Sequence, residues 1–219
     1  MSNRILQFLC VTSLSFFSCQ ASADDDFWIG ARAGSLGLGL EATWQALPYL
    51  DFRAGVNRYD YDDNRSEAGV DYEATLQLDS LYATANLRVP LSPFRITGGV
   101  FANDNSLVLL GRGNGTVNLG GIDYDTSDVG NLRGYTHFED KAPYAGVGFD
   151  FRLMNTLALT LDFGVLWQGD ATVELAADGP LAIDPLFQAQ LEAERTQLEE
   201  AMKDFRAYPV VAIGLSVNF

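Results

Sequence analysis

The chain lacks any long hydrophobic run. Although 47% of its residues are hydrophobic, no internal stretch approaches the roughly 20 consecutive apolar residues that a membrane-spanning helix requires. The other structure that satisfies every backbone group within lipid is a closed β-barrel. At 219 residues the chain is long enough for one domain, and nothing in its composition indicates two.

Positive charge is also scarce. The chain carries 14 lysines and arginines against 29 aspartates and glutamates, a net charge of −15 at pH 7. Such a surface repels nucleic acid, so that class of partner is excluded.

Histidine is limited to a single residue, His137. The nearest serines in sequence, Ser106 and Ser127, stand in no activating motif. A lipid A-modifying hydrolase, which needs a histidine beside a nucleophile, is therefore kept only as a second alternative. We expect no catalytic residues, no cofactor and no metal site.

Cysteine is confined to the N-terminal segment. That segment has an apolar core over residues 5–17 and a small-residue cleavage site, Ala21-Ser22-Ala23, which is typical of a signal peptide. We predict that residues 1–23 are removed and that residues 24–219 form the mature domain, without a thiol or disulfide. An uncleaved anchor helix and lipidation at Cys19 are the alternatives.

What the chain has instead is strict alternation of apolar and polar residues, the period-2 pattern of a strand with unlike faces. Residues 36–44 show it clearly, with an apolar residue at every second position. The alternation in residues 70–89 changes phase near Asp79-Ser80, and we interpret this change as a β-bulge. Eight strands are predicted, at residues 27–33, 36–44, 50–57, 70–89, 94–102, 146–153, 157–167 and 211–219. The first of them requires a very tight hairpin at Gly34-Ser35, and the alternative is an N-terminal segment inside the barrel.

The connections alternate in length. Short periplasmic turns opposite long external loops are typical of outer-membrane barrels, whereas a soluble sandwich has no reason to sort its loops in this way. We therefore predict an all-β fold, an antiparallel up-and-down transmembrane barrel in the cell outer membrane. The tight turns lie near residues 47–49, 89–93 and 154–156, and the long joints cover residues 58–69, 103–141 and 170–207.

One amphipathic helix is predicted over about residues 184–205, in the last long joint. Asp184-Pro185 supplies an N-cap and a proline at the first helical position. By strand counting the helix is extracellular, and it could rest on the barrel mouth, in the outer leaflet or on a surface partner. We favour the mouth. Its apolar stripe consists of Phe187, Leu191, Leu198, Met202 and Phe205.

Charged residues of both signs fall on the polar faces of the predicted strands. An eight-stranded barrel is only wide enough for side chains to fill it, and an unpaired buried charge is very costly. We predict an interior ion-pair network that plugs the barrel, and a narrow path for ions or small solutes is the alternative. The network residues are Glu41, Arg53, Asp71, Glu73, Arg88, Arg95, Asp150, Arg152 and Asp162.

The predicted joint at residues 58–69 is rich in acids and tyrosines. We interpret acids such as Asp60, Asp62 and Asp63 as part of a solvated loop. We assign tyrosines near strand ends, including Tyr59 and Tyr61, to an interfacial aromatic girdle.

The chain ends in Phe219, with Val217, Leu215 and Ile213 at every second position before it. This ending resembles the signal recognised by the outer-membrane barrel assembly machinery, which we expect as a partner.

The mature chain also resembles a family of small, uncharacterised proteobacterial outer-membrane proteins. The barrel type is similar to the OmpA transmembrane domain, without a peptidoglycan-binding module. The resemblance implies a fold and a location and transfers no catalytic residues. We expect a structural or surface-interaction role, with outer-membrane lipid and lipopolysaccharide around the barrel and a surface partner for residues 184–205. The segments that carry the resemblance are residues 33–41, 142–149, 184–189 and 208–211.

Overall fold

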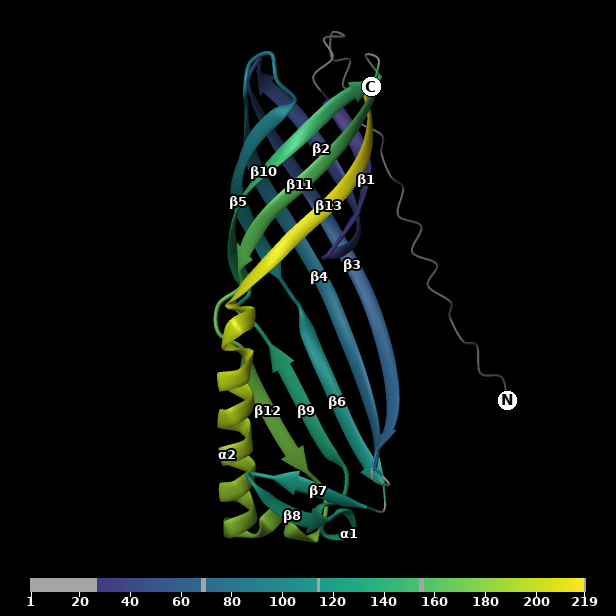
Figure 1. Ribbon diagram of the computed structural model, residues 1–219, viewed down its shortest axis with the longest axis vertical. Helices are drawn as coiled ribbons and strands as arrows, with labels where there is room; N and C mark the ends of the chain where they lie inside the picture. Colours follow the sequence, from purple (N-terminus) through teal and green to yellow (C-terminus); the bar gives the residue numbers. More distant parts are fainter. Residues whose placement is uncertain (1–26, 68–69, 114, 154–155, 219) are drawn as a thin grey trace, which may run out of the picture.

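The chain folds into a closed antiparallel β-barrel of eight strands, seen in the upper half of Figure 1. The computed structural model describes residues 27–67, 70–113, 115–153 and 156–218, so the predicted signal peptide at residues 1–23 lies outside the described residues. The predicted fold class and strand number are confirmed. In order around the barrel the strands are β1 (Phe27–Gly34), β2 (Gly37–Leu47), β3 (Leu50–Glu67), β4 (Val70–Arg88), β5 (Phe94–Asn103), β10 (Lys141–Leu153), β11 (Leu157–Trp167) and β13 (Ala207–Asn218), which pairs with β1.

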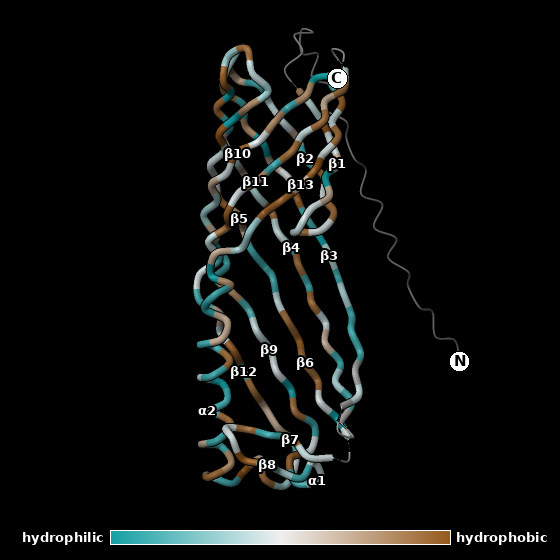
Figure 2. Tube along the Cα trace, viewed as in Figure 1, coloured by the Kyte–Doolittle hydropathy of each residue, from teal (hydrophilic) through white to brown (hydrophobic). Residues whose placement is uncertain are grey.

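The outer wall of the barrel is apolar. Because side chains alternate across a strand, each strand sends one set into the lumen and the other set outward. The outward set stays exposed, as with Leu38 at 68% and Leu40 at 62% of full exposure. Figure 2 shows the apolar residues recurring along the barrel strands.

Beyond the barrel rim part of the wall continues as a separate sheet. β3 and β4 run on past the rim, and β6 (Ser106–Gly113), β9 (Leu132–His137) and β12 (Thr172–Ala177) extend the sheet from β4 in that order. We call these five strands the projecting sheet. The joints predicted at residues 58–69, 103–141 and 170–207 therefore hold strands where loops were expected, and that expectation is corrected for their described residues. The helix predicted within the third joint is present as α2 (Pro185–Ala201).

The phase change in β4 is not a β-bulge. The β3–β4 register runs without a shift from Leu50↔Leu87 to Glu67↔Val70, so the predicted bulge at Asp79-Ser80 is wrong. Instead, the polarity of the two faces reverses at the rim. Within the barrel the apolar residues of β4 face outward, and beyond it they face the concave side that continues the lumen.

A small core closes the tip of the projecting sheet. It is built by β7 (Thr116–Leu119), β8 (Ile122–Asp125), α1 (Thr126–Val129), η1 (Pro180–Ile183) and α2 (Pro185–Ala201), which η2 (Met202–Arg206) links to β13. Phe187 and Leu191 of α2 are buried there against Val117, Leu119 and Val129. None of the helices in the described ranges combines the length and hydropathy needed to cross a bilayer.

The predicted helix exists, but its expected resting place on the barrel mouth is wrong. The helix α2 packs beside β12 and lies below β13 in Figure 1, along the flank of the projecting sheet. The physical reason lies in its first half, where Phe187 and Leu191 find an apolar core at the tip, away from the mouth. Phe205, counted in the same stripe, is 52% exposed.

The start of α2 depends on Asp184. Its carboxylate accepts hydrogen bonds from the backbone N–H groups of Leu186 (2.8 Å) and Phe187 (3.0 Å). Loss of such an N-cap costs about 1 kcal/mol. We expect Asp184→Ala to speed hydrogen exchange in the first turn of α2 about fivefold. Asp204→Ala, in η2 and away from any cap, is the matched control, and equal exchange in the two variants would contradict the capping role.

Candidate functional site

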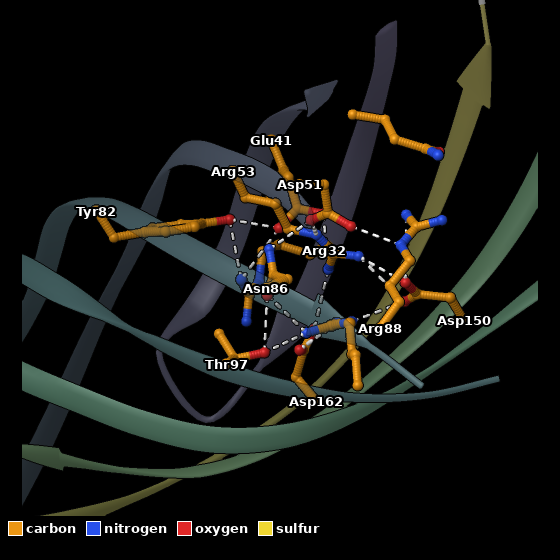
Figure 3. A network of polar contacts seen from close by, with 12 residues as sticks. Arg32, Glu41, Asp51, Arg53, Tyr82, Asn86, Arg88, Thr97, Asp150 and Asp162 are labelled. Atoms are coloured by element: carbon orange, nitrogen blue, oxygen red, sulfur yellow. Dashed lines mark hydrogen bonds and ion pairs between the residues drawn. The ribbon is translucent and has the colours of Figure 1, made fainter. Parts of the chain in front are cut away.

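The barrel lumen holds the densest cluster of charged side chains among the described residues, drawn in Figure 3. It combines four arginines with four carboxylates, so that the charges balance. The arginines are Arg32, Arg53, Arg88 and Arg95, and the carboxylates are Glu41, Asp51, Asp150 and Asp162.

Arg95 joins the carboxylates of two neighbouring strands. It is fully buried, and its Nε donates to Asp150 Oδ1 at 2.9 Å while its Nη2 donates to Asp162 Oδ1. Its Nη1 donates to Asn86 Oδ1 (3.1 Å) and Thr97 Oγ1 (2.6 Å). Gly148 gives the guanidinium its space, because a Cβ at that position would lie 2.6 Å from Arg95 Cζ.

Arg53 is held more loosely than Arg95. Its Nη2 donates to both carboxylate oxygens of Asp150, at 3.0 and 3.1 Å. Its Nη1 lies 3.6 Å from Glu41 Oε1 and 3.9 Å from Asp162 Oδ2 without a hydrogen bond. Arg53 is therefore stabilised by several carboxylates at once.

The end of the lumen beside the short turns is anchored by Asp51. This fully buried carboxylate accepts from Arg88 Nε and from Asn86 Nδ2, both at 2.6 Å. The cavity left between the lumen side chains measures only about 10 Å³. That is at the lower limit, about 10–15 Å³, for one water molecule. Side chains therefore fill this part of the lumen almost completely.

An apolar layer lies above the charges, toward the projecting sheet. Leu36, in the turn between β1 and β2, is folded inward and is 3% exposed. The side chain of Tyr82 connects the two layers, since its hydroxyl accepts from Arg32 (2.9 Å) and donates to Glu41 (2.7 Å). The layer consists of Leu36, Tyr82, Phe101, Ala142, Tyr144, Leu166 and Val210.

Six of the nine predicted network residues meet in this cluster, a seventh lies on the lumen side at the end of the barrel, and two lie outside the lumen. Asp71 and Glu73 are exposed on the outer face of the projecting sheet, because the faces of β4 exchange polarity at the rim. The assignments of Asp71 and Glu73 to the interior are therefore corrected. Arg152 lies on the same lumen-facing side of β10 as Asp150, at the exposed end of the strand. There it donates to Gln45 Oε1 at 2.7 Å, and its guanidinium stands 5.4 Å from the ring centre of the buried Trp28.

Two members of the network, Arg32 and Asp51, were missed. Both alternate with apolar residues in predicted strands, as Arg53 does, so the period-2 pattern was sufficient to find them. Charge balance was a second signal, because the nine predicted residues contain four arginines and five carboxylates.

The tyrosines of β3 and β4 that were assigned to an interfacial aromatic girdle lie on the projecting sheet instead. Tyr59, Tyr61 and Tyr72 occupy the positions of β3 and β4 that face the concave side of the projecting sheet. Tyr59 and Tyr61 are stacked, with ring centroids 6.4 Å apart.

His137 lies at the end of β9, directly opposite Ser106 of β6 in the strand register. No hydrogen bond joins the two, since His137 Nδ1 is buried without a partner among the described residues. The ring instead stacks on Tyr135, with centroids 5.4 Å apart.

Of the predicted assembly signal, Ile213, Leu215 and Val217 lie on the outward face of β13 and are 41–51% exposed. Phe219 lies outside the described residues.

The lumen makes a specific prediction about stability. Removing one partner of a buried ion pair leaves an uncompensated charge and costs about 3–5 kcal/mol. We expect Arg95→Met to lower the free energy of unfolding by that amount in urea titrations of the refolded barrel, followed by tryptophan fluorescence. Arg195→Met is the matched control. Arg195 pairs with Glu192 and Glu199 on the surface of α2, and such pairs contribute about 0–1 kcal/mol. Equal losses of unfolding free energy in the two variants would show that the buried lumen pairs contribute no more to stability than exposed pairs do.

Comparisons with known proteins agree with this architecture. No protein-family profile and no curated protein sequence matches the chain. Among solved structures, CarO2 of Acinetobacter baumannii is similar at 21% sequence identity with a TM-score of 0.61, and the match covers 90% of this chain and 100% of CarO2. CarO of the same organism is similar at 18% identity with a TM-score of 0.58, over 90% and 100% of the two chains. The likeness shows the fold, a closed eight-stranded antiparallel barrel with one helix before its last strand.

Proposed function

We propose that this chain is an outer-membrane protein whose barrel is a sealed anchor and whose projecting sheet is an interaction surface outside the cell. The observation that carries the proposal is the filled lumen: four arginines and four carboxylates balance one another beneath an apolar layer. Such a barrel holds the projecting sheet in place and gives solutes no route.

The outer wall supports the membrane placement. Exposed apolar patches of more than a few hundred Å² are rare on soluble monomers, yet every barrel strand sends exposed apolar side chains outward. Examples are Ile29, Leu40, Val56, Leu81, Val100, Val147, Phe163 and Ile213. The fold is also that of CarO2 and CarO, which are outer-membrane barrels.

The orientation follows from the loops. The turns at residues 48–49 and 89–93 are short and lie at the end of the barrel opposite the projecting sheet. In outer-membrane barrels the short turns face the periplasm. This supports the proposal that the projecting sheet and α2 lie outside the cell, with lipopolysaccharide around the rim and the end of β13 on the periplasmic side, toward the assembly machinery.

The alternatives have less support. A narrow channel needs a continuous polar path, and the lumen cavity is about 10 Å³. A lipid A hydrolase needs an activated nucleophile, and no hydrogen bond between Ser106 and His137 favours it.

The anchor is tested by fractionation and conductance. We expect the protein in the outer-membrane fraction, with an unboiled gel band that shifts on boiling, as a folded barrel gives. In planar bilayers the purified barrel should produce no conductance steps, because its lumen is filled. Discrete steps from folded protein would favour the channel instead, and a soluble periplasmic protein without a gel shift would exclude both.

The membrane boundary is tested on one face of β4. Ala83 and Gln77 both point outward, one within the barrel and one beyond the rim. We expect Ala83→Arg to destabilise the barrel folded into lipid vesicles by about 2–4 kcal/mol, the cost of arginine near the bilayer midplane. Gln77→Arg should stay within about 0.5 kcal/mol of the unchanged protein, as surface substitutions do. Equal effects of the two substitutions would contradict a membrane boundary between residues 77 and 83.

A further inference from the structure

The projecting sheet lacks the part of the wall above β1 and β2. The turn at Ser35 and Leu36 joins these two strands at the rim. The pairing between β2 and β3 stops there, and its pair nearest the rim is Leu38↔Arg58. From Tyr59 onward, no described residue pairs with that edge of β3. We call the edge from Tyr59 to Glu67 the free edge.

The opposite edge of the same sheet is protected. There α2 packs along β12, and the backbone N–H of Val173 donates to Glu199 Oε1 at 3.2 Å. Unprotected sheet edges present rows of unpaired donors and acceptors that invite another strand, and proteins commonly cover them. One edge of the projecting sheet is covered and the other is not.

The register shows which backbone groups the free edge offers. Arg88 N donates to Tyr49 O at 2.8 Å, so residues 49 and 88 form a hydrogen-bonded pair of the β3–β4 ladder. Because hydrogen-bonded and non-bonded pairs alternate in an antiparallel ladder, the odd-numbered residues of β3 bond to β4. Asp60, Asp62 and Asn64 therefore turn their N–H and C=O groups away from β4, toward the vacant position.

The side chains beside the free edge differ on the two faces. On the outer face Asp60 and Asp62 are exposed, and the only cation in contact with Asp60 among the described residues is the exposed Arg58, at 3.2 Å. On the concave face Tyr59 and Tyr61 are 44% and 50% exposed, and their rings stack nearly parallel. The two tyrosine rings therefore present an accessible aromatic surface beside the free edge.

Charge selects between the candidate occupants. A second copy paired edge to edge would place its own Asp60 and Asp62 against those of the first, and like charges opposite one another destabilise a sheet. The net charge of −15 adds to that repulsion. An added strand with cations opposite the two aspartates would instead form favourable cross-strand pairs.

We propose that the free edge of β3 binds an extended, positively charged peptide segment of a partner protein, which adds to the projecting sheet as a strand. Main-chain hydrogen bonds supply the affinity in this mode of recognition, and alternate side chains supply the specificity. Lysine or arginine lies on the outer face beside Asp60 and Asp62, and apolar or aromatic residues lie on the concave face beside Tyr59 and Tyr61. This inference rests on the proposed surface role and names the partner's chemistry.

The probe is a labelled peptide of about ten residues, the length of a long strand, in which lysine alternates with valine and tyrosine. Its binding to the refolded full-length protein in neutral detergent is followed by fluorescence anisotropy. A peptide of the same composition with its lysines in one block keeps the charge and loses the alternation.

Two variants separate the backbone from the charge. Asn64→Pro removes a donor on the free edge and leaves the β4 side of β3 intact, as edge positions allow, and Asn64→Ala is its control. We expect Asn64→Pro to weaken peptide binding about five- to tenfold, the effect of losing roughly one hydrogen bond. Asp60→Asn with Asp62→Asn should weaken binding by a similar factor and reduce its dependence on salt. Glu174→Gln with Glu200→Gln, on the side of β12 and α2, is the matched charge control. The gel shift on boiling verifies that each variant is folded.

The outcomes separate this inference from the proposed function. Saturable binding of the alternating peptide that Asn64→Pro weakens and Asn64→Ala does not supports strand addition. Equal binding of the block peptide, or no effect of Asn64→Pro, would reduce the site to an acidic surface and overturn the inference. No saturable binding, or self-association of the protein that Asn64→Pro abolishes, would overturn it too. In each case the conductance result decides separately whether the barrel is sealed.

Discussion

The pairing of charges inside a narrow barrel is the constraint on which the rest of this structure depends. Eight strands enclose a lumen that side chains must fill, and here they fill it with four arginines and four carboxylates. Arg95 reaches two carboxylates only because Gly148 leaves room beside it. A glycine that weakens a strand elsewhere is thus required here by the size of its neighbour. Because every charge depends on partners from other strands, the barrel is fixed in one register and shape.

The sequence of β4 shows where the surroundings of this strand change from those of the barrel to those of the projecting sheet. Along β4 the lumen side carries Asn86, Thr84 and Tyr82 within the barrel, and the same side carries Leu78 and Leu76 beyond the rim. On the proposed placement, lipid surrounds the outer face of the barrel and water surrounds the outer face of the projecting sheet. The same alternation therefore reverses its polarity without any change in backbone register. A phase change in the hydrophobic pattern of a barrel strand can mark a solvent boundary as readily as a bulge.

This distinction explains how far the sequence could be interpreted. The eight barrel strands, including the tight first hairpin, and the helix with its Asp184 cap were predictable because alternation and capping are local signals. Asp71 and Glu73 were misplaced because alternation shows which residues share a face but not what surrounds that face. The strand β6 was missed because Leu107, Val108, Leu109 and Leu110 form an apolar run without alternation. Whether α2 rests on the mouth or on the sheet depends on a core at the tip that several distant segments build together, and no local pattern encodes such a core.

Among the described residues, polar groups are paired in the lumen and along one edge of the projecting sheet, but not along its other edge. In the lumen every carboxylate of the network has a cationic partner, and the sheet edge at β12 is covered by α2, where Glu199 accepts from the backbone N–H of Val173. At the free edge of β3, backbone donors and acceptors stay open beside exposed acids and tyrosines. A uniform need for stability would have favoured covering both edges, since an uncovered edge brings a risk of aggregation. The acidic side chains at that edge limit the risk for copies of the same chain, because they repel one another, and they leave the edge accessible to a segment of opposite charge.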